Sequence, residues 1–163
     1  MKTLVIGYGN LDRQDDGVAW HVLSKLMQEF GVEKPNDINI DFFNPKKDVH
    51  FLYQLQLLPE LADELSDYDY AVFIDAHNGA MPSDVYFEQL SPIFTSSPLT
   101  HHLSANSLLS ITNQIHHKYP KSILVSIRGF EFSFSQCLSS QTASLVSIAV
   151  EKIHEWMNNQ GKD

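Results

Sequence analysis

Two adjacent carboxylates, Asp15 and Asp16, follow a glycine turn early in the chain. The preceding residues 3–6 are apolar and mostly β-branched, which is typical of a buried strand in a parallel sheet. Apolar residues then recur at helical spacing over 18–30. We therefore predict that both carboxylates lie in a strand-to-helix loop, at the edge where open α/β sheets bind their ligands.

The chemistry that these carboxylates favour is cation binding. A helix N-terminus attracts anions through its free N–H groups and its dipole, but here two negative charges already occupy that position. Asp15 is interpreted as a helix cap, because aspartate is favoured there. One cap does not require two acids, so we assign Asp16 to chemistry and expect it to face a metal ion or a metal-bearing partner.

The glycines of this loop do not complete a nucleotide-binding motif. Gly7 and Gly9 match the first two glycines of the dinucleotide fingerprint, but Asp12 occupies the third position. The sequence also lacks the Gly-Lys-Ser/Thr of a phosphate-binding loop. The alternative is a nucleotide-binding domain, and the acidic loop argues against that function. Calorimetry that detects binding of ADP or NAD would support it.

A second acid, Asp75, ends the continuous apolar strand predicted over 70–75. His101 and His102 lie on a loop before a helix predicted over 105–115. A loop histidine that meets two acids completes a carboxylate–carboxylate–imidazole set, which suits nickel, zinc, iron or manganese. Three protein ligands leave coordination positions open for water or substrate.

The sequence leaves open whether His77 or His102 joins this set. His77 lies two residues after Asp75 and is either part of the site or an exposed loop histidine.

Strand and helix patterns alternate along the rest of the chain. Further strands are predicted over 38–43, 85–90 and 122–127, and further helices over 60–65 and around an apolar stripe at 145–157. His50 is assigned to a loop, and Ser139 or Ser140 is expected to cap the last helix.

This order predicts an α/β fold, a three-layer α/β/α domain with a mostly parallel sheet of about five strands. The segment 85–90 alternates apolar and polar residues, so we expect an antiparallel edge strand there. In such a sheet the first and third predicted strands can be neighbours, which would make Asp16 and Asp75 face one crevice.

The composition indicates one globular domain over residues 1–163, with 43% hydrophobic residues and a formal net charge of −9. That charge disfavours nucleic acid and anionic membranes, which bind basic patches. We expect a cytoplasmic protein, because neither a signal peptide nor an apolar run of about 18 residues is present. The single cysteine, Cys137, has no base nearby in sequence and is not expected to be a catalytic thiol.

Several short motifs share their order and spacing with one protease family. They are Gly7-Tyr8-Gly9-Asn10 with Asp15-Asp16-Gly17, Gln56-Leu57-Leu58-Pro59-Glu60-Leu61-Ala62, Val72-Phe73-Ile74-Asp75-Ala76, His101-His102-Leu103-Ser104 and Ile127-Arg128-Gly129-Phe130-Glu131. On these motifs the chain resembles the hydrogenase maturation endopeptidases over nearly its whole length.

The resemblance implies an endopeptidase that removes a C-terminal peptide from the large-subunit precursor of a nickel-iron hydrogenase after nickel insertion. It places the metal contacts on Asp16, Asp75 and His101, and our own hypothesis gives the catalytic role to Asp16 and Asp75. The nickel would belong to the substrate, and other divalent metals could occupy the site in vitro. No nucleotide is implied as a partner. The loop residues that would shape the site are Gly7, Gly9, Asn10, Asp15 and Gly17.

The reaction route and one alternative function follow from the same residues. No Ser-His-Asp or Cys-His arrangement is evident, so we expect a carboxylate or a metal-polarised water to perform the hydrolysis. Whether Asp16 or Asp75 acts as the base, or whether both are only ligands, is left open.

The alternative function is a non-catalytic checkpoint module that recognises the nickel-loaded large subunit without cutting it. Ala19 stands where the family usually has a second glycine, so helix packing behind the loop could differ.

Overall fold

The computed structural model describes residues 1–95 and 102–162 of the chain. Its elements, in chain order, are β1 (Thr3–Tyr8), η1 (Gln14–Gly17), α1 (Val18–Glu29), β2 (Asp41–Asn44), β3 (Val49–Gln54), α2 (Leu61–Leu65), β4 (Tyr70–His77), β5 (Val85–Gln89), α3 (Ala105–His116), β6 (Lys121–Arg128), α4 (Ser140–Ala143) and α5 (Val146–Asn159). Among the described residues, no helix has both the length and the apolar character that crossing a bilayer requires.

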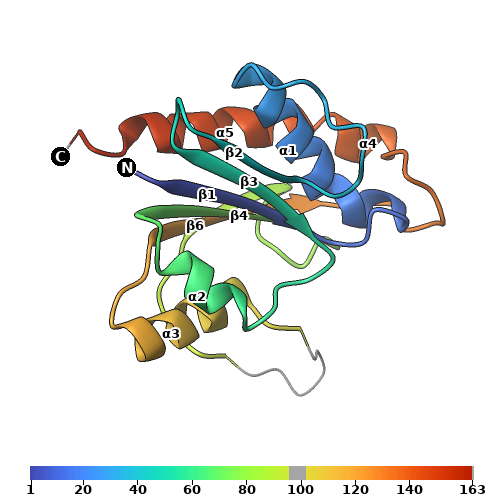
Figure 1. The fold of residues 1–163 in the computed structure, drawn as a ribbon. Coiled ribbons are helices and arrows are strands. Elements are labelled where there is room, and N and C mark those ends of the chain that lie inside the picture. Colours follow the sequence, from blue (N-terminus) through green and yellow to red (C-terminus); the bar gives the residue numbers. More distant parts are fainter. Residues whose placement is uncertain (96–101, 163) are drawn as a thin grey trace.

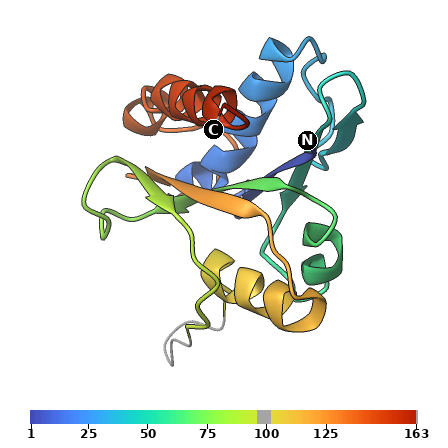
Figure 2. The same ribbon diagram turned by 90° about the vertical axis from the view of Figure 1, so that its left-hand side faces the viewer.

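The strands form one six-stranded sheet in the order β2-β3-β1-β4-β6-β5. The pairs β3–β1, β1–β4 and β4–β6 are parallel, whereas β2 and β5 pair antiparallel at the two edges. α1 and α5 cover one face of the sheet, and α2 and α3 cover the other (Figures 1 and 2). The predicted three-layer α/β/α class is therefore confirmed, and so is the antiparallel edge strand at β5.

The predicted number of strands is too low, because the sequence pattern misses β3 and assigns His50 to a loop. His50 lies inside β3. Its two ring nitrogens lie 2.5 Å from the Tyr68 hydroxyl and 2.6 Å from Asp41 Oδ1. These partners satisfy a polar side chain within the sheet, which is a tertiary effect that periodicity does not reveal.

The C-terminal helical region is divided into α4 and α5. The expectation that Ser139 or Ser140 caps the last helix is wrong, because α5 has no side-chain cap and Ser139 instead caps α4, where its hydroxyl accepts a hydrogen bond from the Thr142 backbone N–H. The Thr142 hydroxyl in turn donates to the carbonyl of Arg128 at the end of β6, at 2.9 Å. These bonds hold α4 against the carboxyl edge of the sheet before α5 begins.

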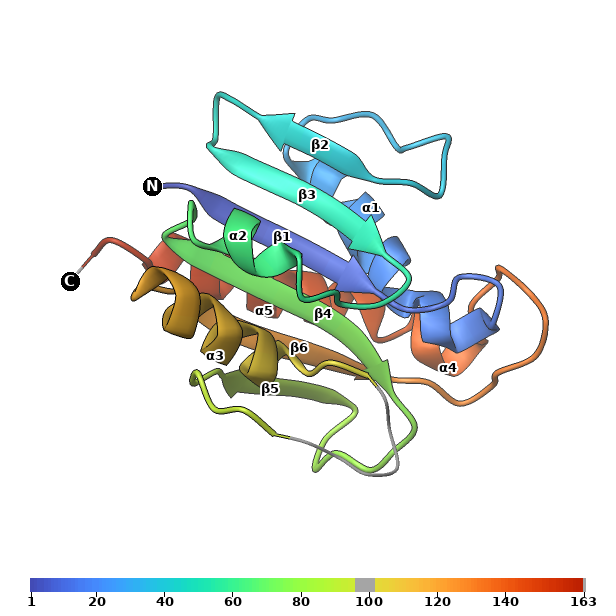
Figure 3. The same cartoon turned by 60° about the horizontal axis from the view of Figure 1, so that its bottom comes forward.

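Alternation along the strands divides the core between the two faces of the sheet. In β4, Val72 and Ile74 belong to the cluster that includes α1 and α5, whereas Ala71 and Phe73 belong to the cluster that includes α2 and α3. Asp75 continues the second row, so its side chain lies on the α2–α3 face at the carboxyl end of β4. Figure 3 shows the parallel strands ending at this common edge.

A buried carboxylate, Asp15, joins the first loop to the segment after β6. Its Oδ2 accepts hydrogen bonds from the N–H groups of Phe130 and Glu131 and from the Ser139 hydroxyl, at 2.7–2.9 Å. Its Oδ1 accepts the Ser139 N–H at 2.8 Å. Burial alone would raise the pKa of Asp15, but these hydrogen bonds outweigh it and lower the pKa to about 2. The interpretation of Asp15 as a cap of its own helix is wrong, because no side-chain capping bond is present there.

Replacing this carboxylate should destabilise the fold. We expect Asp15→Asn to lower the free energy of unfolding by about 2 kcal/mol at neutral pH, since a lowered pKa measures the preference of the folded state for the charged form. That stability is present above the unfolded-state pKa and is lost as the pH falls toward about 2. Urea unfolding at several pH values measures the difference, with the exposed Asp67→Asn as control. Equal stabilities of Asp15→Asn and the native protein would contradict this role.

Candidate functional site

The loop after β1 is shaped by a glycine that no other residue could replace without strain. Gly9 has a φ of 144°, and a Cβ at this position would lie 2.1 Å from the carbonyl oxygen of Asp16. The Gly9 N–H donates to the carbonyl of Gln54, and the Tyr53 hydroxyl donates to the Gly9 carbonyl at 2.6 Å. The backbone of the first loop is therefore fixed against the end of β3.

The same loop brings Asp16 back toward the end of β1. The Asn10 N–H donates to Asp16 Oδ2 at 2.8 Å, and Asn10 Oδ1 accepts the N–H of Asp12 at 3.0 Å. Behind the loop, a Cβ at Gly7 would lie 3.1 Å from the Cβ of Ala19. The alanine at position 19 is therefore accommodated, because Gly7 supplies the room for α1 to pack directly on β1.

Asp75 meets the end of β1 through a side-chain hydrogen bond. The Tyr8 hydroxyl donates to Asp75 Oδ2 at 3.0 Å, between neighbouring parallel strands. Burial and the adjacent Asp75 raise the pKa of Tyr8 well above its ordinary value, so the hydroxyl stays protonated and remains a donor.

The electrostatics of Asp75 differ from those of a surface carboxylate. Burial and, to a smaller extent, the negative charge of Asp16 raise the pKa of Asp75 to about 6, against the opposite effect of the neighbouring Ser126 and Tyr8 hydroxyls. Asp75 is consequently an acid that changes its charge close to neutral pH.

Asp16 and Asp75 line one pocket of about 230 Å³ at the carboxyl edge of the sheet. Its walls come from the loop after β1, the segment after β3, the end of β4 and the approach to α3. The lining residues are Tyr8, Gly9, Asp16, Leu55, Gln56, Leu57, Asp75, Ala76, His102 and Leu103. The crevice expected from the sequence thus contains both acids, and His102 lies at its wall.

The third member of the predicted ligand set is His101, which lies outside the described residues. Within 1–95 and 102–162, no group of at least three His, Cys, Asp or Glu side chains is arranged to hold a metal ion. The set of Asp16, Asp75 and His101 therefore stays a prediction.

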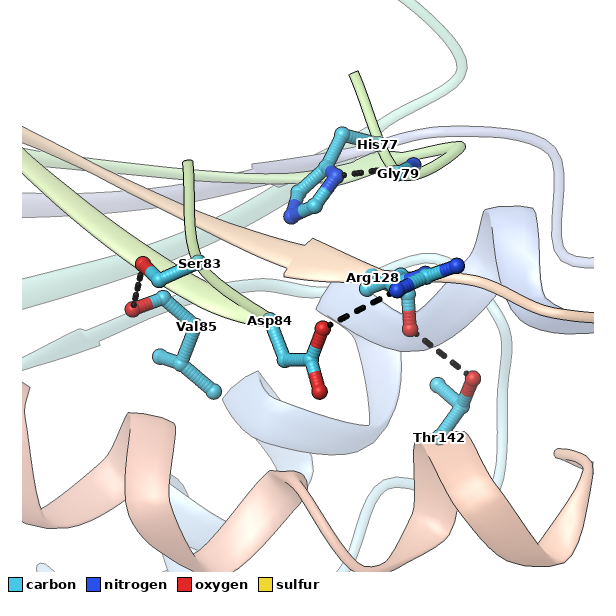
Figure 4. Close-up of polar contacts among 7 residues, drawn as sticks. All are labelled: His77, Gly79, Ser83, Asp84, Val85, Arg128 and Thr142. Atoms are coloured by element: carbon cyan, nitrogen blue, oxygen red, sulfur yellow. Dashed lines mark hydrogen bonds and ion pairs between the residues drawn. The ribbon is translucent and has the colours of Figure 1, made fainter. Parts of the chain in front are cut away.

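His77 is neither an exposed loop histidine nor part of the lining of this pocket. It is the last residue of β4 and is 9% exposed. Its Nδ1 accepts the N–H of Gly79 at 3.0 Å (Figure 4). The neighbouring strand places Arg128 opposite His77, with its guanidinium 3.3 Å from Asp84. These side chains form a separate polar cluster beyond the acidic pocket.

A larger pocket of about 410 Å³ lies at the opposite, amino-terminal edge of the sheet. Among the described residues, the one carboxylate in its lining is that of Glu29, which is hydrogen-bonded to His154, and its walls include Phe30, Tyr70 and Trp156. Paired acids are the feature that would bind a cation, so the smaller pocket is the candidate site.

Several lining residues escape the sequence analysis. Leu55 and Gln56 follow β3. Because the sequence pattern does not predict this strand, it also does not predict that these two residues line the pocket. Tyr8 was visible only as the residue between Gly7 and Gly9. The strict alternation of β1 is the signal that could have placed its ring on the α2–α3 face, in the row of Leu4 and Ile6.

The chain shares its fold with solved structures of hydrogenase maturation endopeptidases. HybD from Escherichia coli has this fold, with a TM-score of 0.74, 18% sequence identity, and coverage of 99% of this chain and 94% of that chain. The maturation protease HycI from Thermococcus kodakarensis gives a TM-score of 0.65 at 19% identity, covering 97% and 93% of the two chains. The hydrogenase 2 maturation peptidase of a thaumarchaeon gives 0.63 at 19% identity, covering 97% and 99%. No family model matches the chain, and no curated protein matches it in sequence. At these identities the likeness establishes the fold.

Removing the charge of Asp75 should stabilise the protein. Its pKa is raised from 3.8 to about 6 in the folded state, so folding becomes less favourable as the pH rises through this interval. We expect Asp75→Asn to gain about 1–3 kcal/mol of unfolding free energy above about pH 7, and to gain little near pH 4. Urea unfolding at both pH values measures this, with Asp67→Asn as the exposed control. A less stable variant at neutral pH would refute the buried-charge account.

Proposed function

We propose that this protein is an endopeptidase that removes a C-terminal peptide from the nickel-loaded large-subunit precursor of a nickel-iron hydrogenase. The observation that carries the proposal is that Asp16 and Asp75 line one pocket. The fold around this pocket is shared with solved hydrogenase maturation proteases. We expect it to act in the cytoplasm, with the precursor as its partner and without a nucleotide.

The nickel ion of the precursor would serve as the recognition element. Asp16 and Asp75 repel each other within the pocket, and a divalent cation would relieve this repulsion and lower the pKa of Asp75. His101, as the family resemblance implies, would add an imidazole nitrogen to the two carboxylate groups. A precursor without the ion would leave the repulsion in place, so cleavage would depend on prior nickel insertion.

Hydrolysis requires a group that takes a proton from the attacking water. We assign this role to Asp75, because burial makes its carboxylate more basic than an exposed one, with a pKa of about 6 in the absence of the cation. The water oxygen bonds to the scissile carbonyl carbon as its proton passes to Asp75. The carbon–nitrogen bond then breaks, and the proton is delivered to the departing amine.

Incubating the protein with nickel-loaded precursor and weighing the product by mass spectrometry tests the proposal. We expect a shortened large subunit with nickel and an intact one without it. Asp16→Asn and His101→Ala should each slow processing by at least about 100-fold, because each removes a proposed contact to the ion. Cys137→Ser is the control and should be close to neutral, since Cys137 is exposed and forms no disulfide.

Two results would overturn the proposal in different ways. Full processing by Asp16→Asn would remove the assignment of the site. Binding of the nickel-loaded precursor without any shortening by the native protein would favour the non-catalytic checkpoint module instead.

A further inference from the structure

The side chain of Tyr8 is held in a fixed position beside Asp75. Tyr8 lies between Gly7 and Gly9, and the bonds of Gly9 to Gln54 and Tyr53 restrain the backbone that follows it. Its ring lies on the α2–α3 face and lines the acidic pocket. The position of the hydroxyl is therefore set by the sheet and the glycine loop.

The hydrogen bond from Tyr8 makes the two oxygens of Asp75 unequal. Oδ2 accepts the Tyr8 hydroxyl at 3.0 Å. Oδ1 is buried and has no hydrogen-bond partner among the described residues. Ser126 lies opposite Asp75 in the register of β4 and β6, and its nearby hydroxyl lowers the pKa of Asp75, but within the same residues it does not reach the hydrogen-bond geometry of Tyr8. In this part of the chain, Tyr8 thus makes the one side-chain hydrogen bond of good geometry to the Asp75 carboxylate.

The chemical type of the donor also matters. A lysine or arginine at this position would neutralise Asp75, and the pocket would lose its attraction for a cation. A phenol donates one hydrogen bond and carries no charge. Tyr8 can therefore fix the plane of the carboxylate while leaving its negative charge available.

We propose that Tyr8 is a positioning residue for Asp75, whose hydrogen bond to Oδ2 fixes the plane of the carboxylate that meets the substrate-borne cation or the attacking water. The proposal rests on the proposed function, because it assigns Tyr8 a part in that reaction. A carboxylate held in one orientation meets the substrate at the correct angle in every encounter, whereas a rotating carboxylate does so only part of the time.

The test is Tyr8→Phe, which removes the hydroxyl and keeps the ring. We expect kcat for the nickel-loaded precursor to fall about 10- to 100-fold, with KM changed less than about twofold, because the variant affects the reacting carboxylate and leaves the remaining contacts in place. Tyr70→Phe removes a hydroxyl from the opposite end of β4 and should leave both constants unchanged. Crystal structures of the native protein and of Tyr8→Phe should show the Asp75 carboxylate rotated in the variant, with the Gly9 loop in place.

The outcomes separate this proposal from the proposed function. If the native protein does not shorten the precursor, the proposed function fails, and the role of Tyr8 in the reaction fails with it. If the native protein is active, an unchanged kcat in Tyr8→Phe overturns the positioning role, as does a Tyr8→Phe crystal structure in which Asp75 keeps its orientation. A lower kcat together with a rotated carboxylate supports it.

Discussion

The parallel pairing of β1 with β4 is the constraint on which the site depends. In their register Gly7 lies beside Ile74, so the next residues along the two strands, Tyr8 and Asp75, meet at the carboxyl edge. The chain can then return to that edge only by a tight turn, which the backbone of Gly9 permits. The two acids repel each other and would not meet by themselves. The strand order and the turn at Gly9 bring them into one pocket.

The charges of two carboxylates at this edge have opposite effects on the stability of the fold. Asp15 is buried among four hydrogen-bond donor groups, and its pKa falls to about 2. Asp75 is buried with fewer donors beside a second negative charge, and its pKa rises to about 6. The first stabilises the structure by being charged, and the second destabilises it by being charged. Under the proposed function, a carboxylate that is unfavourable in the isolated protein would be available for the cation of the substrate, as in the general exchange of stability for function at active sites.

The sequence predicted the features that depend on local pattern, and it failed where tertiary contacts decide. Continuous apolar strands ending in acids placed Asp75 correctly, and the glycine turn placed Asp16 correctly. β3 escaped because His50 interrupts its pattern, and the bonds that make His50 acceptable come from distant residues. Asp15 was given a capping role because its donors lie more than 100 positions away in the chain. The role of His101 rests on the family resemblance alone.

The two edges of the sheet differ in what they hold. Asp16 and Asp75 are at the carboxyl edge, whereas Met1 and Gln160 line the pocket at the amino-terminal edge. β1 begins and α5 ends on this second side in Figure 1. An affinity tag or a fusion partner joined to either end would therefore extend away from the acidic pocket. Immobilised through such a tag, the molecule would present that pocket to the solution, unobstructed by its attachment.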